Sequence, residues 1–262
     1  KLKAPLTKLR PQLEALLDVW MGNFIFFVRM NVTEIVSTVD PNLASSFFHL
    51  FDSMVDHLLV QHEDDEVKAE DEVRLASMLQ PLFVFCCIWS YGASASTSGR
   101  DKVDAFVRKM AIENPISVPI PGEGSVYDYI FEEEQMVWLP WLESIPVFTL
   151  GANLEYSEKL VPTVESVSSL FITRKLLSHS KLVLCCGGTG TGKSVNIQKL
   201  LKTTDSPGNP GMPSKYLPLF MSFSAQTTCT MVQTILDSKF ERRRLGRDRD
   251  NTGLDFAGWG AT

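Results

Sequence analysis

The sequence predicts an α/β half-domain with an incomplete core sheet, preceded by a mainly helical segment with a small β-hairpin. Three observations support this fold class. Apolar residues recur at helical spacing before residue 113. Prolines and alternating aromatic residues follow, up to residue 152. An apolar run, a glycine-rich turn and a second helical pattern then succeed one another before residue 202, which is the order of elements in α/β domains.

These changes of texture define four regions. We expect a helical segment over residues 1–113, a hairpin linker rich in proline and aromatic residues over 114–152, the N-terminal part of the α/β domain over 153–245, and a disordered or unrelated tail over 246–262.

Helices account for most of the first region. Leu13 to Ile35 has helical spacing that is interrupted at Gly22 and Asn23. Asp40 followed by proline indicates a helix start, because a side-chain acceptor and a proline both suit the free N–H groups of a first turn. Further helices are expected over Val73–Tyr91 and over residues 100–110. The helix after Asp40 carries an apolar stripe of Phe47, Phe48, Phe51, Met54, Leu58 and Leu59.

Two acidic clusters in these regions are predicted to be solvated surface. The run from His62 to Glu72 is expected to be a loop or helix start, and its spacing does not match the ligands of a hard cation, although a metal or partner site is the alternative. Residues 126–131 and 136–141 are predicted to pair as a hairpin around Glu132-Glu-Glu-Gln135. A hairpin tip in water explains these carboxylates better than acid/base catalysis does.

Residues 187–194 read Gly-Gly-Thr-Gly-Thr-Gly-Lys-Ser and fit the phosphate-binding loop pattern G-x-x-x-x-G-K-[ST] at every position. The apolar residues 181–186 before the loop and the helical spacing of 195–201 after it give the expected strand, turn and helix. Glycines let consecutive N–H groups turn toward an anion, and the helix adds its positive N-terminus. We therefore predict a nucleoside triphosphate site, in preference to a glycine-rich turn that merely precedes a lysine. Lys193 would reach the β- and γ-phosphates, and Ser194 would ligate Mg²⁺.

The α/β pattern continues on both sides of this loop. An extended piece at Leu160–Thr163 and a helix through Leu177 precede it. After a connection rich in proline and glycine, a second strand is expected over Tyr216–Phe223 and a helix over Ser224–Phe240. Hydrolysis in this class also needs an apolar strand that ends in acids and holds Mg²⁺. Asp255 is the sole candidate and has no apolar strand before it, so we expect the chain not to hydrolyse nucleotide by itself.

Composition limits the other classes of function. The 262 residues are 44% hydrophobic and 21% charged, as in globular proteins. A net charge of −6 argues against a nucleic-acid surface, and the cluster Arg242–Arg249 is better explained as a solvated helix end. The longest apolar run, Leu82–Trp89, is too short to span a membrane.

Cysteine usage points to a reducing compartment. Cys86 and Cys87, like Cys185 and Cys186, are adjacent pairs inside apolar runs, and Cys229 is the fifth cysteine. This arrangement favours buried thiols over a disulfide framework or a zinc site. The expected location is the cytosol, or an assembly in contact with it.

An ordered set of motifs resembles the dynein heavy chain. Val161-Pro-Thr163 precedes the loop at 187–194, and two further stretches follow it: Phe223-Ser-Ala-Gln-Thr-Thr228 and Lys239-Phe-Glu-Arg-Arg-Arg244. Together they are similar to the start of the third AAA+ module of the dynein motor ring. The first half is similar to the stretch that joins the second module to the third, through Asp40-Pro-Asn-Leu43, Phe85-Cys-Cys-Ile-Trp-Ser90, Val126-Tyr-Asp-Tyr129 and Trp138-Leu-Pro-Trp141. The resemblance covers roughly residues 11–245.

The resemblance implies a fragment of a six-module motor that moves on microtubules, in the cytoplasm or in the axoneme of a cilium or flagellum. Residues 1–113 would be the lid and linker of the preceding module. Partners implied through the parent chain are the other AAA+ modules, dynein intermediate and light chains, and microtubules, with no nucleic acid and no membrane. The third module's site regulates the motor, and its ligand is ATP with Mg²⁺. The residues assigned to the nucleotide are Val161, Pro162, Gly187, Gly188, Thr189, Gly190, Thr191, Gly192, Lys193 and Ser194, with Ser194 on the metal and no residue assigned to catalysis.

Two departures from the family's usual pattern are visible. Gly188 stands where the family usually has proline, which loosens the loop but still permits a nest of N–H groups. Ser168 and Ser169 stand where an arginine and a tyrosine are common. The alternative function is a truncated, non-catalytic structural fragment that packs against neighbouring modules. A separate small-molecule kinase fits poorly, since the loop lies late in the chain and leaves little room for a lid and an acceptor site.

Overall fold

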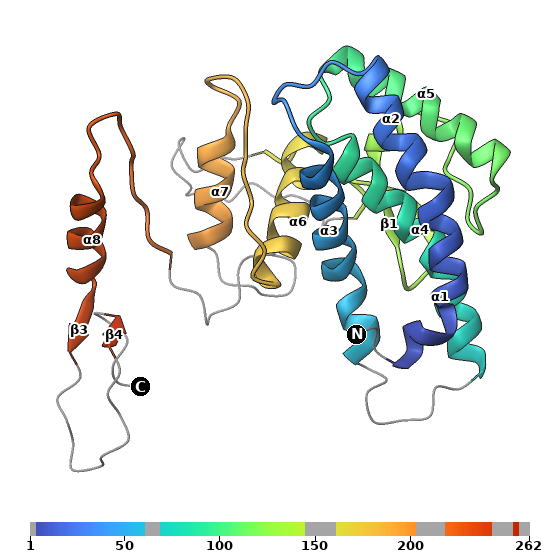
Figure 1. The fold of residues 1–262 in the computed structure, drawn as a ribbon, viewed down its shortest axis with the longest axis horizontal. Helices are drawn as coiled ribbons and strands as arrows, with labels where there is room; N and C mark the ends of the chain where they lie inside the picture. Colours follow the sequence, from blue (N-terminus) through green and yellow to red (C-terminus); the bar gives the residue numbers. More distant parts are fainter. Residues whose placement is uncertain (1–3, 61–68, 145–160, 203–217, 243–253, 257–262) are drawn as a thin grey trace, which may run out of the picture. The chain divides into compact units, whose positions relative to one another are not determined.

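The computed structural model describes residues 4–60, 69–144, 161–202, 218–242 and 254–256. The chain divides into one unit over Lys1–Tyr216 and a smaller one over Leu217–Thr262, and each is described by itself. The first unit holds the helical segment, the hairpin and the glycine-rich loop (Figure 1).

The chain starts with a continuous helical rod. It consists of α1 (Ala4–Leu16), the π-helical turn η1 (Leu17–Met21) and α2 (Gly22–Asn31). The predicted interruption at Gly22 and Asn23 does not end the helix, since Gly22 keeps right-handed helical dihedrals. The helix instead has one wider, π-helical turn just before Gly22. The side-chain amide of Asn23 donates a hydrogen bond to the carbonyl of Val19 at 2.8 Å.

The core lies between the rod and two long helices, α3 (Asp40–Val60) and α4 (Ala69–Tyr91). The predicted stripe on α3 is buried at Phe47, Phe51 and Met54, whereas Phe48 is exposed and the side chains of residues 58 and 59 lie outside the described part. Aromatic rings join the three helices, and they include Tyr91, whose ring centre lies 5.5 Å from that of Phe47 and 5.4 Å from that of Phe24.

The start of α3 corrects one detail of the prediction. The helix does begin at Asp40, but the Asp40 carboxylate accepts from Arg29 Nε at 2.8 Å. The first amides of the helix instead use a backbone acceptor, because Asn42 and Leu43 both donate to the carbonyl of Val39, at 3.0 and 3.1 Å.

Helix α4 is the central helix of the core, as predicted. By length and composition its Val73–Tyr91 stretch could cross a membrane, but most of it is buried inside the protein, as in the core helix of a soluble domain. Pro81 lies within the helix and has no N–H to donate to Ser77, four residues earlier. The Ser117 hydroxyl replaces that donor at 2.5 Å from the Ser77 carbonyl, and the loop before the hairpin is thereby tied to α4.

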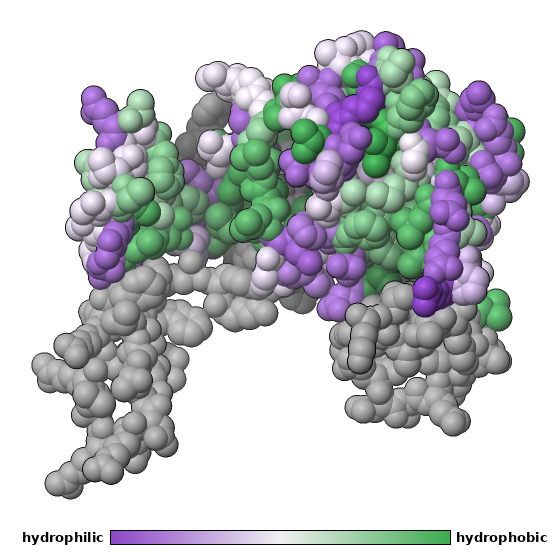
Figure 2. Space-filling view, in the orientation of Figure 1, coloured by the Kyte–Doolittle hydropathy of each residue, from purple (hydrophilic) through white to green (hydrophobic). Residues whose placement is uncertain are grey.

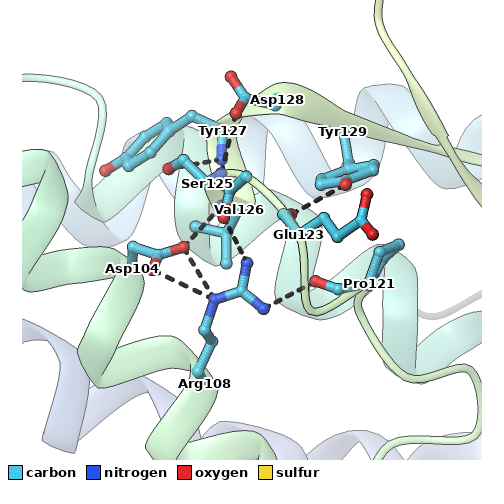
Figure 3. Close-up of polar contacts among 10 residues, drawn as sticks. Asp104, Arg108, Pro121, Glu123, Ser125, Val126, Tyr127, Asp128 and Tyr129 are labelled. Carbon is cyan, nitrogen blue, oxygen red and sulfur yellow. Dashed lines mark hydrogen bonds and ion pairs between the residues drawn. The ribbon is translucent and has the colours of Figure 1, made fainter.

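Helix α5 (Thr97–Glu113) holds the other side of this loop, through the contacts in Figure 3. Arg108 Nε lies 3.1 Å from the Asp104 carboxylate, and its two terminal nitrogens donate to the carbonyls of Pro121 and Gly124 at 2.7 and 2.9 Å. Asp104 also accepts from the amide of Val126 at 2.7 Å. One arginine and one aspartate therefore fix the chain that enters the hairpin.

The predicted hairpin is present. After the 3₁₀ turn η2 (Val126–Asp128), strands β1 (Tyr129–Glu132) and β2 (Val137–Pro140) pair antiparallel, with Phe131 opposite Trp138. Glu133 and Glu134 lie at the turn, where Arg74 of α4 donates to their carbonyls at 3.3 Å, whereas Glu132 ends β1. Trp141 follows β2 and is fully buried, with its indole N–H 2.9 Å from the carbonyl of Tyr127.

Helix α6 (Val164–Ser178) packs on α3 and on this core. Of the predicted extended piece, residues 161–163 are described, and Thr163 is extended. Thr163 and Ser166 form a reciprocal capping box at the start of the helix. Phe171 contacts two rings of this core, those of Trp141 and Phe85, with ring centres at 5.4 and 6.4 Å.

The predicted strand over residues 181–186 does not form. These residues carry no regular secondary structure, Leu182 and Leu184 are 96% and 84% exposed, and Cys185 and Cys186 are exposed instead of buried. The reason is the lack of a partner, because no strand in the described ranges pairs with this run. Figure 2 shows the resulting hydrophobic surface in green over this run and α7 (Lys193–Lys202). The other adjacent pair, Cys86 and Cys87, is buried as predicted.

The second unit contains α8 (Cys229–Asp237) and the antiparallel strands β3 (Phe240–Arg242) and β4 (Leu254–Phe256). The described residues of the predicted strand, 218–223, are not in a strand, and the predicted helix over 224–240 is shorter than expected. Cys229, Met231 and Ile235 of α8 are exposed, so the described residues do not cover these side chains, and Cys229 is not buried as predicted. The predicted connection of residues 206–214 lies outside them.

Candidate nucleotide-binding site

The glycine-rich loop has the local geometry that its sequence requires. Gly190 and Gly192 have φ angles of 79° and 76°, which side-chain-bearing residues adopt only with strain. Helix α7 starts directly after the loop at Lys193, and its first hydrogen bond runs from the amide of Asn196 to the carbonyl of Gly192 at 2.9 Å. The helix N-terminus is thus placed at the end of the loop.

Lys193 spans the loop. Its ammonium group donates to the carbonyl of Gly187 at 2.9 Å, to the carbonyl of Gly188, and to the Thr191 hydroxyl at 2.9 Å. These bonds join the two ends of the loop and hold a positive charge next to its backbone.

The backbone amides of the loop remain available. Among the hydrogen bonds of the described residues, none has the N–H of residues 189–194 as its donor. A run of unused N–H groups, a helix N-terminus and a lysine together form a site for an anion such as phosphate.

A cavity of about 540 Å³ adjoins the loop within the first unit. Thr191 and Lys193 contribute to its wall, together with Asn196 and Ile197 of α7. Cavities of this size are typical of small-molecule and cofactor sites. Helix α6 forms part of the wall through Glu165, and the helical segment contributes Trp89 and Arg100. The Arg100 guanidinium lies 5.0 Å from the ring centre of Tyr127, which is one of the core rings.

The structure brings together only part of the predicted site. Of the residues assigned to nucleotide, Thr191 and Lys193 line the cavity, whereas Val161 and Pro162 are not in its wall. Val161 is exposed beside the start of α6, and Ser194 is exposed in the first turn of α7. The roles of Val161, Pro162 and Ser194 therefore stay predictions.

Asn196 was not singled out from the sequence. Its position four residues after Gly192 places it on the helix face above the loop, and this spacing is the signal that could have identified it. No sequence pattern identifies Trp89 and Arg100 in the same way, because they line the cavity only through the tertiary packing of the helices.

Three ionisable side chains away from the loop, Cys86, Cys87 and Lys175, are buried or partly buried in the first unit. Burial raises the pKa of the Cys86 and Cys87 thiols well above the usual value, which keeps them protonated and unreactive. Burial also lowers the pKa of Lys175 on α6, while the charge of Glu133 acts against that shift. No group of three or more histidine, cysteine or acidic residues that could hold a metal occurs in the described part of the chain.

Two family models match the chain. Residues 13–143 match the dynein heavy chain AAA lid domain, and residues 148–247 match the P-loop containing dynein motor region. The helical segment with its hairpin therefore corresponds to the first, and the segment with α6, the loop and α7 corresponds to the second.

Several curated relatives align over most of the chain. Dynein axonemal heavy chain 1 of Homo sapiens is 30% identical over 260 residues, which cover 93% of this chain and 6% of that protein. Dynein axonemal heavy chain 6 of Homo sapiens is 30% identical over 84% of this chain and 5% of its own length. Dynein axonemal heavy chain 3 of Mus musculus is 31% identical over 84% of this chain and 6% of its own length. The chain thus spans about one-twentieth of the length of these relatives.

Proposed function

The chain belongs to the dynein heavy chain family, and from that membership we propose that its glycine-rich loop binds Mg·ATP as a regulatory site of a motor. In this proposal the chain carries the lid of the second AAA+ module and the start of the third. The parent motor moves on microtubules in the cytoplasm or in an axoneme, with the other ring modules and the dynein intermediate and light chains as partners. The axonemal relatives favour the axoneme.

One observation carries the proposal of a nucleotide site. Lys193 is held across the loop by Gly187, Gly188 and Thr191, while the backbone N–H groups of residues 189–194 find no acceptor among the described residues. A polyphosphate supplies the acceptors that these amides lack and the negative charge that the lysine and the helix N-terminus favour. Ser194, in the first turn of α7, would offer its hydroxyl to the Mg²⁺ ion that accompanies the phosphates.

The packing of α6 supports a regulatory role. Helix α6 contacts α7, which begins in the loop, and its Phe171 contacts Trp141 and Phe85 of the lid core. A shift of α7 on nucleotide binding would therefore act on a helix that is anchored in the preceding lid. Such a connection lets the lid and the loop influence each other.

The test is binding of Mg·ATP to the full 262-residue chain by isothermal titration calorimetry. Lys193→Ala should abolish binding, because the loop loses the cation that faces the phosphates. Lys199→Ala is the matched control: Lys199 is exposed on the same helix, and its loss changes the net charge equally. Equal affinity of the two variants would rule out the loop as the nucleotide site.

A structural role is the second candidate, and the exposed apolar run before the loop favours it. Leu182 and Leu184 have no strand partner in the described ranges, as expected for a surface that other parts of a ring cover. Absence of Mg·ATP binding by the unaltered chain, with the lid folded, would favour this role.

A further inference from the structure

The hydroxyl of Thr191 has two hydrogen-bond partners inside the loop. It accepts from Lys193 Nζ at 2.9 Å and donates to the carbonyl of Gly188 at 3.0 Å. A hydroxyl has one hydrogen to donate, so its orientation is fixed by Gly188 and its lone pairs face Lys193. The methyl group of Thr191 lies 3.9 Å from the position that a Cβ on residue 188 would take.

All donors of Lys193 are in use. An ammonium group has three hydrogens, and its acceptors here are two backbone carbonyls and the Thr191 hydroxyl. A phosphate oxygen that binds Lys193 must therefore displace one of these acceptors. The carbonyls of Gly187 and Gly188 can leave only if the backbone of the loop moves, whereas the Thr191 hydroxyl leaves by rotation about one side-chain bond.

We propose that Thr191 is a positioning residue, whose hydroxyl holds the ammonium of Lys193 and is exchanged for a phosphate oxygen when nucleotide binds. The proposal rests on the proposed nucleotide site, and it names a residue that sets the affinity of that site for nucleotide. The threonine competes with phosphate for one donor of Lys193, so its hydroxyl weakens binding of ligands that reach the lysine.

Two substitutions separate the hydroxyl from the shape of the side chain. Thr191→Val removes the hydroxyl and keeps the methyl group next to Gly188, and Thr191→Ser keeps the hydroxyl and removes the methyl group. A hydrogen bond to a charged group in solvent is at the weak end of its range. Thr191→Val should therefore bind ATP and ADP about threefold to tenfold more tightly than the unaltered chain, and Thr191→Ser should bind them as the unaltered chain does. Affinity for AMP, which lacks the phosphates that Lys193 reaches, should not change.

A second measurement needs no nucleotide. Acylation of lysines by an N-hydroxysuccinimide ester, followed by peptide mass spectrometry, reports how freely each ammonium is exposed. Lys193 should react faster in Thr191→Val than in the unaltered chain or in Thr191→Ser, while Lys199 reacts equally in all three. This readout tests the hold on Lys193 even if the loop does not bind nucleotide.

The outcomes are distinguishable. Faster labelling of Lys193 in Thr191→Val together with tighter ATP binding supports the proposal. If labelling is faster in Thr191→Val but the unaltered chain binds no nucleotide, Thr191 does hold Lys193 and the proposed nucleotide site is wrong. Equal labelling of Lys193 in the three chains, or equal or weaker ATP binding by Thr191→Val, overturns the role of Thr191 whatever the loop binds.

Discussion

Phe171 of α6 meets Trp141, the residue after the hairpin, with ring centres 5.4 Å apart and ring planes 61° apart. Trp141 is fully buried, and its indole N–H donates to the carbonyl of Tyr127, so its orientation is fixed by the hairpin. Edge-to-face rings at this separation stabilise a fold by more than the burial of their apolar area accounts for. This contact therefore anchors the helix that leads to the glycine-rich loop in the core of the lid.

Phe171→Ala should lower the free energy of unfolding by about 2–3 kcal/mol, because it removes a partly buried aromatic side chain together with its ring contacts to Trp141 and Phe85. Urea denaturation followed by tryptophan fluorescence measures the change. The same truncation at Ile112, which is 80% exposed on α5, should change stability by less than about 0.5 kcal/mol. Equal effects of the two substitutions would show that Phe171 anchors nothing.

Arg108→Lys should cost about 1–2 kcal/mol of stability, although the charge is kept. The guanidinium reaches the Asp104 carboxylate and the Pro121 carbonyl, as Figure 3 shows, and it also reaches the carbonyl of Gly124. A single ammonium at the end of a flexible chain cannot make all three contacts. Thermal denaturation by circular dichroism gives the comparison.

The reverse exchange at the next residue is the control for Arg108. Lys109 is 73% exposed and lies 3.8 Å from Glu113, so Lys109→Arg should leave the melting temperature unchanged. A melting temperature of Arg108→Lys equal to that of the unaltered chain would mean that the two carbonyls are satisfied by water.

Helices and the hairpin could be predicted from the sequence because each of them satisfies its backbone within a short stretch. The apolar spacing around Phe47 and in Val73–Tyr91 predicted buried faces, and the strands around Glu132–Gln135 are close enough in the chain to pair. The widened turn at η1 was missed, because the pattern break at Gly22 looks the same whether a helix ends or bulges.

The strand predicted over residues 181–186 was wrong for a different reason. Apolar, β-favouring residues form a strand only beside another strand, and that partner is not specified by the run itself. In the candidate site, the motif predicted the glycine turns and the position of Lys193. It gave no information on the acceptors that Lys193 finds in Gly187, Gly188 and Thr191, since those depend on the path of the backbone.

Gly92→Ala should destabilise the lid by about 1–3 kcal/mol, as overpacked core substitutions do. A Cβ at this position would overlap the Tyr127 hydroxyl, and it would lie 2.7 Å from the carbonyl of Ile88. The Tyr127 hydroxyl, which donates to the Gly92 carbonyl at 2.9 Å, would have to move. Differential scanning calorimetry measures the loss.

Gly122→Ala supplies the comparison for Gly92, since a Cβ there meets nothing within 4 Å. Its melting temperature should stay within error of the unaltered chain. Adding Tyr127→Phe to Gly92→Ala should recover part of the loss by removing the clashing oxygen. No recovery would place the strain at Ile88 instead.

Glu34 joins Arg29 of α2 to Thr38, which precedes α3, and to Ser94, which follows α4, and the stability of the lid should depend on its charge. Its carboxylate accepts from Arg29 Nη1 at 2.8 Å, from the Thr38 hydroxyl at 2.6 Å and from the Ser94 hydroxyl at 3.0 Å. Burial acts to raise the pKa of Glu34, but the bonds from Thr38 and Ser94 and the charge of Arg29 outweigh it. The pKa therefore lies below the usual value of 4.5.

A carboxylate whose pKa is lower in the folded than in the unfolded state stabilises the fold above the unfolded pKa, and this contribution is lost as pH falls through the folded pKa. Glu34→Gln should therefore lower the free energy of unfolding at pH 7 by about 1–2 kcal/mol, because an amide brings N–H groups next to Arg29. The difference between the two chains should shrink as pH falls below 4.5, the usual value. Urea denaturation at a series of pH values follows both curves.

Glu14→Gln makes the same chemical change at a carboxylate that is 56% exposed and paired with Arg10. Its curve should run parallel to that of the unaltered chain at every pH, because an exposed pair of this kind contributes little to stability. If the Glu34→Gln difference were instead constant from neutral to acid pH, its cost would come from packing of the amide and not from the lost charge. The contribution of Glu34 would then be steric, and Arg29 would need no anionic partner at residue 34.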